Sequence, residues 1–169
     1  MVTLEQFRYC PTHSTHPPFC YDFHYVKPGM VAIFGDNGSG KSTLAQLMAG
    51  WYPDFLPGEI TGTGTLLGTP IGRLPLNEQS ATIQLVQQSP YLQLSGCTFS
   101  VEEEVAFGPE NLCLAEKEIM ARIDAALALT ECQPLRHRHP ATLSGGETQR
   151  VVTASQTPVS YTHLRAHET

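Results

Sequence analysis

The fold is decided by the stretch Gly35-Asp36-Asn37-Gly38-Ser39-Gly40-Lys41-Ser42-Thr43 and by what lies on either side of it. The five residues before it, over 30–34, are all apolar, which predicts a strand covered on both faces of a largely parallel sheet. The residues after it predict a helix over 41–48, closed by Gly50. A strand, a glycine-rich loop and a helix in this order indicate an α/β or α+β domain.

The loop itself fits the pattern GxxxxGK[ST]. Its glycines let the backbone curl with the N–H groups pointing inward around phosphate oxygens, and the following helix adds its positive end at the same place. In such a loop Lys41 reaches the β- and γ-phosphates, and the Ser42 hydroxyl binds Mg²⁺. The alternative is a plain glycine-rich turn that caps a helix. The position between an apolar strand and a helix favours a phosphate-binding loop.

Composition narrows the class of protein. The chain has 169 residues, is 41% apolar and has a net charge of −6, which suits a globular domain and argues against binding a nucleic acid backbone. The sequence lacks an apolar stretch near the ~18 residues that cross a bilayer and lacks an export signal, so we expect an intracellular protein. Histidines pair as His13 with His16 and His137 with His139, but without further ligands at metal-binding spacing, which favours solvated loop histidines.

Periodicity predicts the other elements. These are strands over 2–9 and 19–25, short antiparallel strands between 57 and 72, a strand over 81–86, and helices over 101–107 and 115–130. The last helix has Ile119, Ile123, Ala126 and Leu127 on one stripe and Arg122 off it. A helical segment therefore follows the predicted sheet.

Two further stretches resemble a known family. The stretch Leu143-Ser144-Gly145-Gly146-Glu147-Thr148-Gln149-Arg150 resembles the LSGGQ signature of ABC ATPases, with Glu147 where the consensus has Gln. The stretch Val86-Gln87-Gln88-Ser89-Pro90 resembles their Q-loop. Leu-Ser-Gly-Gly alone also fits an ordinary helix cap. With the phosphate loop, in this order and spacing, the chain is identified as a member of the ABC ATPase superfamily.

A narrower resemblance lies in Val101-Glu102-Glu103-Glu104-Val105-Ala106-Phe107-Gly108-Pro109-Glu110-Asn111-Leu112. This stretch is similar to "VEEDVAFGPENL" in the ATPase subunits of energy-coupling factor importers, which take up cobalt, nickel and vitamins. From the residues alone, a surface helix with a solvated acidic run is the simpler interpretation. The resemblance extends over essentially residues 1–155.

The resemblance implies a fold and a division of the chain. The fold is an α/β P-loop NTPase (RecA-like) core of the ABC ATPase type, with an antiparallel β subdomain and a helical insertion, truncated at its C-terminus. The expected parts are a nucleotide-binding core over 1–88, a helical subdomain over 89–142, the signature and the start of its helix over 143–158, and a non-native tail over 159–169. The tail resembles a translated sequencing adaptor.

The resemblance also implies roles for residues. Nucleotide is bound by Tyr9 and by the loop 35–43, where Tyr9 stacks on adenine; a core tyrosine at a strand end is the alternative. Lys41 and Gln88 are catalytic, and Ser42 and Gln88 hold Mg²⁺. The signature residues 143–147 contact the ATP of a second ABC subunit or domain, arranged head to tail.

The implied partners are a transmembrane coupling subunit and a substrate-binding membrane subunit at the cytoplasmic face of the membrane, for import of a metal ion or vitamin. A soluble ABC protein without a membrane partner is an alternative, and so is an inert fragment. Hydrolysis also needs adjacent Asp and Glu downstream of the signature. The four aspartates, Asp22, Asp36, Asp54 and Asp124, all lie upstream, which predicts an N-terminal piece that at best binds nucleotide weakly and does not turn it over.

Overall fold

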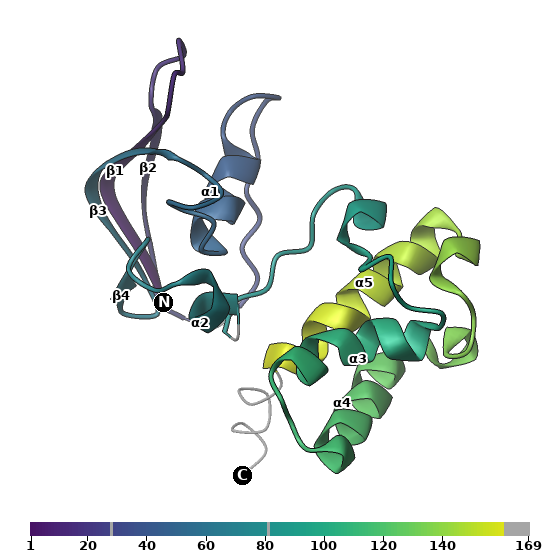
Figure 1. Ribbon diagram of the computed structural model, residues 1–169. Coiled ribbons are helices and arrows are strands. Elements are labelled where there is room, and N and C mark those ends of the chain that lie inside the picture. The colour runs from purple at the N-terminus through teal and green to yellow at the C-terminus, as the bar shows by residue number, and fades with distance from the viewer. Residues whose placement is uncertain (28, 81, 161–169) are drawn as a thin grey trace. The chain divides into compact units, whose positions relative to one another are not determined.

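The computed structural model describes residues 1–27, 29–80 and 82–160. The chain folds into two compact units, Met1–Ile83 and Gln84–Thr169 (Figure 1). Their boundary falls just before the stretch 86–90, and each unit has its own hydrophobic core. The expected parts bounded at 88, 142 and 158 remain predictions.

The first unit contains a four-stranded antiparallel sheet in the order β2-β1-β3-β4 (Figure 1). The strands are β1 (Val2–Pro11), β2 (Phe19–Tyr25), β3 (Gly58–Leu66) and β4 (Thr69–Pro70). The register of β1 shifts against both neighbours around Gln6, whose φ of 46° marks an irregularity in the strand. The strands predicted over 2–9, 19–25 and within 57–72 are therefore confirmed.

One helix covers this sheet. Helix α1 (Lys41–Met48) buries Leu44 and Leu47 against the side chains of Leu4, Phe7 and Tyr9 from β1. Each fully buried leucine contributes on the order of 1.5–3 kcal/mol by leaving water. The short helix α2 (Leu76–Ser80) follows the sheet. The predicted bounds of α1 are confirmed, and the position of this helix fixes the end of the glycine loop.

The strand predicted over 30–34 is wrong. This segment has no regular secondary structure, and the side chains of Met30 and Phe34 are 98% and 90% exposed. A strand buried on both faces needs a neighbour to pair with, and β1–β4 pair only among themselves in the part of the chain that the structure describes.

The strand predicted over 81–86 is also not formed at 82–86, and Ala81 lies outside the described residues. The backbone bonds to a side chain instead of a neighbouring strand. The Gln87 N–H donates to Gln93 Oε1, and Gln93 Nε2 donates to the Leu85 carbonyl, both at 2.7 Å.

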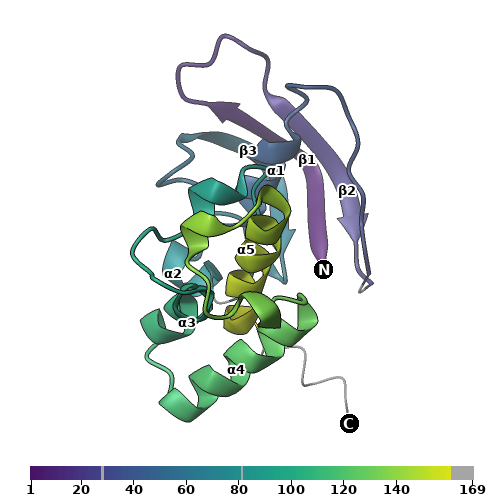
Figure 2. The same cartoon turned by 90° about the vertical axis from the view of Figure 1, so that its right-hand side faces the viewer.

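The second unit consists of helices. They are α3 (Val101–Asn111), α4 (Glu116–Leu129) and α5 (Gly145–Ser160), with 3₁₀ helices at Pro90–Gln93, Gln133–Leu135 and Pro140–Thr142. Helix α5 packs against α3 and α4 (Figure 2), around a core that includes Val105, Leu127 and Val151. Both predicted helices are confirmed. The backbone of 159–160 continues α5, and the rest of the expected tail, 161–169, lies outside the described residues.

Helix α4 differs from its prediction at one residue. The stripe is confirmed, with Ile123, Ala126 and Leu127 buried and Ile119 packed against them. Arg122, expected off the stripe, is only 8% exposed. An arginine stem can cover apolar surface while its charge stays paired, and Arg122 Nη2 lies 2.5 Å from Glu118 Oε1.

Polar contacts join the helices of this unit. Arg136 pairs with Glu102 of α3 at 2.5 Å and with Asp124 of α4 at 2.6 Å. Glu104 is 3% exposed, and its carboxylate accepts hydrogen bonds from the Ser95 N–H and hydroxyl, both at 2.7 Å, and from the Thr98 hydroxyl at 2.5 Å. These contacts fix the loop before α3 to the helix.

Candidate functional site

The glycine loop forms a tight turn at the start of α1. The Ser39 N–H donates to the Asp36 carbonyl at 3.2 Å, and Gly38 and Gly40 have left-handed φ values of 82° and 90°. Gly40 is the N-cap residue of α1 and has no side chain to cap it. A Cβ at Gly40 would lie 2.6 Å from the Phe19 ring, so both its conformation and its surroundings require glycine.

Lys41 closes over this loop. Its Nζ donates to the carbonyls of Gly35 and Asp36, both at 2.7 Å, and to Ser39 Oγ at 3.3 Å. No carboxylate in the described part of the chain forms a salt bridge with Lys41. Its positive charge therefore stands at the positive end of a helix, an arrangement that favours an anion.

The other loop residues lie where the sequence places them. Asp36 and Asn37 are exposed at the tip, Ser42 is exposed in the first turn of α1, and Thr43 is half-buried. Mg²⁺ prefers oxygen ligands and usually keeps several waters in its coordination shell. An exposed hydroxyl beside the loop, such as that of Ser42, suits such an ion. The structure thus brings all nine loop residues together.

Two roles were predicted for Tyr9, stacking on adenine or packing in the core, and the structure places it in the core. It is fully buried, its hydroxyl donates to the Pro57 carbonyl at 3.0 Å, and its ring meets Tyr52 edge to face at 6.3 Å. Burial is the main reason that the pKa of its phenol is raised. A ring with no exposed face cannot stack on a base, so stacking of Tyr9 on adenine is contradicted in this structure.

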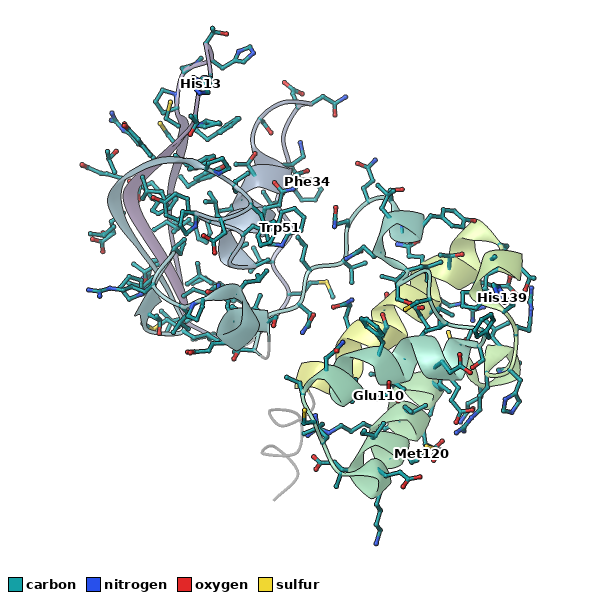
Figure 3. All side chains as sticks on the ribbon, in the orientation of Figure 1. His13, Phe34, Trp51, Glu110, Met120 and His139 are labelled. Atoms are coloured by element: carbon teal, nitrogen blue, oxygen red, sulfur yellow. The ribbon has the colours of Figure 1, made fainter. Side chains whose placement is uncertain are left out.

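A cavity of about 490 Å³ lies next to the loop within the first unit. Its lining includes Tyr21 and Phe23 of β2, Phe34 of the segment 30–34, and Lys41. Phe34, labelled in Figure 3, is among the most exposed apolar side chains. Val31 and Ile33 also line it, so the segment 30–34 forms one wall of the cavity.

Sequence reasoning missed one neighbour of the loop. The Tyr21 hydroxyl donates to the carbonyl of Gly40 at 2.8 Å. The alternation of β2 does place Tyr21 on the half-buried face, but nothing in the pattern indicates a bond to the loop.

The predicted Q-loop residue Gln88 lies exposed in the second unit. The backbone before it is held by Gln93, whose side-chain amide bonds to both Leu85 and Gln87. An amide can donate and accept at once, so one side chain replaces the pairing of a neighbouring strand. Sequence reasoning missed Gln93, because these contacts join residues in an irregular segment.

The signature stretch forms the N-terminus of α5. Leu143 is buried in the core, and α5 begins at Gly145. The N–H and hydroxyl of Ser144 both donate to Glu147 Oε2 at 2.7 Å, and the Glu147 N–H donates back to Ser144 Oγ at 3.4 Å, which together form a capping box. An added Cβ at Gly146 would have no neighbour within 4 Å. The turn is therefore held from inside by Glu147 and open at Gly146.

Arg138 completes this turn and was not predicted. Its guanidinium donates to Glu147 Oε1 at 2.8 Å and to the Thr142 carbonyl at 2.6 Å. The pKa of Glu147 is lowered, chiefly by the backbone hydrogen bond from Ser144, then by the Ser144 hydroxyl and by Arg138. Glu147 is therefore ionised at neutral pH, where the consensus glutamine is uncharged.

The described residues hold neither a metal cluster nor a membrane-spanning helix. Over 1–27, 29–80 and 82–160, no three His, Cys, Asp or Glu side chains gather as a metal cluster. His139 instead caps a 3₁₀ helix, where its Nδ1 accepts from the Ala141 N–H at 3.1 Å. Within the same residues, no helix has the length and apolar character needed to cross a membrane.

Comparison with known proteins gives a consistent result. The ABC transporter family model matches residues 22–157. A putative ABC transporter ATP-binding protein of Methanosarcina mazei is 39% identical over 155 residues, which are 91% of this chain and 54% of that protein. The energy-coupling factor transporter ATP-binding protein EcfA1 of Levilactobacillus brevis is 43% identical over 124 residues, 73% of this chain and 42% of that protein. The chain spans about half the length of these curated relatives.

Solved structures agree on the fold. The cbiO1 protein from Clostridium perfringens, part of the ABC transporter complex cbiONQ, has a TM-score of 0.78 and 30% identity, over 94% of this chain and 61% of that chain. The dimeric bacterial ABC transporter cassette MJ0796 has a TM-score of 0.71 and 20% identity, over 92% and 68%. The fold class expected from the sequence is confirmed.

Proposed function

This chain belongs to the ABC transporter family, and we propose that it forms the nucleotide-binding region of a transport ATPase. The observation that carries the proposal is the position of Lys41, which lies over the loop 35–40 at the N-terminus of α1 with its charge unpaired by any described carboxylate. This is the arrangement that a triphosphate needs.

Binding proceeds by exchange of partners at the loop. The Lys41 ammonium leaves the carbonyls of Gly35 and Asp36 and donates to phosphate oxygens, while the N–H groups at the start of α1 point at the same phosphates. The bonds that Lys41 gives up join its ammonium to uncharged carbonyls, whereas a bond to a phosphate oxygen joins two opposite charges and is therefore the stronger one. The Ser42 hydroxyl would be the loop's ligand to Mg²⁺, and the remaining loop residues through Thr43 would enclose the phosphates.

The second unit contributes to two sites. By the resemblance of 86–90 to a Q-loop, Gln88 would be the residue that contacts Mg²⁺ and the attacking water, and the backbone just before it is held by Gln93. The signature turn would serve the ATP of a second ABC subunit arranged head to tail, with Gly145 and Gly146, and Ser144 once its donors leave Glu147, facing the γ-phosphate. Leu143 anchors this turn in the core.

The type of transporter we propose is an energy-coupling factor importer for a metal ion or vitamin. Support comes from the similarity to EcfA1 and to cbiO1, the latter named as part of a transporter complex. The stretch 101–112, which forms α3 and the residue after it, supports the same type. The partners are then a transmembrane coupling subunit and a substrate-binding membrane subunit, at the cytoplasmic face of the membrane.

Hydrolysis is proposed for the whole protein, since this chain spans about half the length of its relatives. The chain has no adjacent Asp and Glu to hold Mg²⁺ and orient water. We therefore expect the 169-residue chain to bind ATP without steady turnover.

The test is photo-crosslinking of the purified chain with an azido-ATP analogue in magnesium buffer, together with phosphate release. Wild type is expected to be labelled, excess ATP to compete, and Lys41→Ala to remain unlabelled, with no sustained phosphate release from either. Equal labelling of wild type and Lys41→Ala contradicts binding at the loop. Steady turnover that Lys41→Ala abolishes contradicts the expected lack of hydrolysis.

A further inference from the structure

A phenol from the sheet contacts the last carbonyl of the glycine loop. The Tyr21 hydroxyl on β2 donates to the Gly40 carbonyl at 2.8 Å, and the Leu44 N–H of α1 donates to the same oxygen at 2.8 Å. A carbonyl oxygen has two lone pairs, so these two donors use both of them. The direction of this carbonyl is therefore set from outside the helix as well as from within it.

The direction of the carbonyl decides the direction of the next N–H. The peptide bond between Gly40 and Lys41 is trans, and in a planar trans peptide the C=O and N–H point in opposite directions. Because the Gly40 carbonyl points to β2 and along α1, the Lys41 N–H points away from them. The first N–H groups of a helix have no hydrogen-bond partner within the helix, and the Lys41 N–H is one of them. It belongs to the loop that the triphosphate would occupy.

The phenol is itself held in place. Tyr21 is paired in register with Phe7 of β1, and the two rings lie 6.4 Å apart. Burial is the largest of the causes that raise the pKa of Tyr21 to about 12, so its hydroxyl remains a donor over the whole neutral range. A donor fixed by the sheet and permanently protonated is suited to hold a backbone group in one orientation.

We propose that Tyr21 is a positioning residue for the triphosphate, which it serves by fixing the Gly40 carbonyl and thereby aiming the Lys41 N–H into the loop. This inference rests on the proposed nucleotide site and adds a residue that the GxxxxGK[ST] pattern does not contain. Loss of one neutral hydrogen bond of this kind is expected to weaken phosphate binding about 3- to 10-fold.

The experiment compares Tyr21→Phe with Tyr25→Phe in the full chain. Tyr25 lies on the same half-buried face of β2 as Tyr21, further along the strand. Tyr25→Phe therefore removes the same chemical group from a different position. Calorimetry in magnesium buffer gives the Kd for ATP and for inorganic tripolyphosphate, and urea unfolding gives the stability of each variant. Tripolyphosphate lacks the base and sugar and therefore reports the loop alone.

Tyr21→Phe is expected to weaken both ligands by the same 3- to 10-fold factor, while Tyr25→Phe stays within about twofold of wild type. Tyr21→Phe is expected to have the lower urea midpoint, because it loses the bond to the Gly40 carbonyl, but both variants are expected to be fully folded in the binding buffer, which separates positioning from a general loss of structure. Equal affinities of the two variants, with wild type binding ATP, overturn the role of Tyr21 alone. Failure of wild type to bind either ligand refutes the proposed nucleotide site and this inference with it.

Discussion

Exchange of Gly40 for alanine should cost clearly more stability than the same exchange at Gly38. Both residues have left-handed φ values, 90° and 82°, so each alanine incurs about 1–2 kcal/mol of backbone strain. An added Cβ at Gly38 has no neighbour within 4 Å, whereas at Gly40 it lies 2.6 Å from the Phe19 ring and 2.6 Å from the Tyr21 hydroxyl. Relief of that contact moves the phenol and breaks its bond to the Gly40 carbonyl, which adds about 0.5–1.5 kcal/mol, with further strain from the displaced rings.

The assay is urea unfolding of the full chain followed by tryptophan fluorescence. The single tryptophan, Trp51, lies in the first unit and is labelled in Figure 3, so its signal reports the unit that contains the loop. Replacing glycine by alanine also lowers the conformational entropy of the unfolded chain, which raises the free energy of unfolding. This effect is the same for both variants and cancels in the comparison. Gly40→Ala is expected to be less stable than Gly38→Ala by about 1–2 kcal/mol. Equal losses would refute the argument that the sheet packs against the loop at Gly40.

Two predictions concern the second unit. Arg136 holds the pKa of Glu102 below its ordinary value of 4.5, chiefly through their hydrogen bond, so this pair stabilises the fold above about pH 4.5 and loses its effect as the pH falls through the folded-state pKa. Arg136→Met should therefore be about 1 kcal/mol less stable than wild type at pH 7, and its free energy of unfolding should vary less with pH below about 4.5. Urea unfolding followed by circular dichroism measures both. Parallel pH profiles of variant and wild type would contradict this. Glu104→Gln places an amide that donates as well as accepts among hydrogen-bond donors such as the Ser95 N–H, and should cost about 1–3 kcal/mol in the same assay. The neighbouring exposed Glu103→Gln is the control, and an equal loss there would count against the buried network.

The elements with a clear period were predictable. The alternation in β2 and the apolar stripe of α4 each report a local face, and the structure buries those faces. The segment 30–34 has an equally clear apolar signal, yet it is exposed, because burial on both faces depends on neighbouring strands and not on the segment itself. Arg122 is the opposite case, because its charge predicts exposure and yet it is buried. Its long aliphatic stem lets it cover apolar surface.

Some residues of the candidate site were predictable from the sequence and others were not. The loop 35–43 was predictable because its glycines, Lys41 and Ser42 are required at fixed spacing in the chain itself. Tyr21 and Arg138 were not, because each acts through a backbone carbonyl or a carboxylate that is brought near by folding. Tyr9 had two possible roles in the sequence, and only its burial decides between them.

The central claim is that the loop ending at Lys41 binds the triphosphate of ATP. Titration of Mg²⁺-ATP into the full chain by isothermal calorimetry tests it most directly, with Lys41→Ala as the paired sample. Saturable binding by wild type and at least tenfold weaker binding by Lys41→Ala are predicted, since one charge-assisted hydrogen bond is worth about 1.5–3 kcal/mol. No binding by wild type, or equal binding by both proteins, would contradict the account.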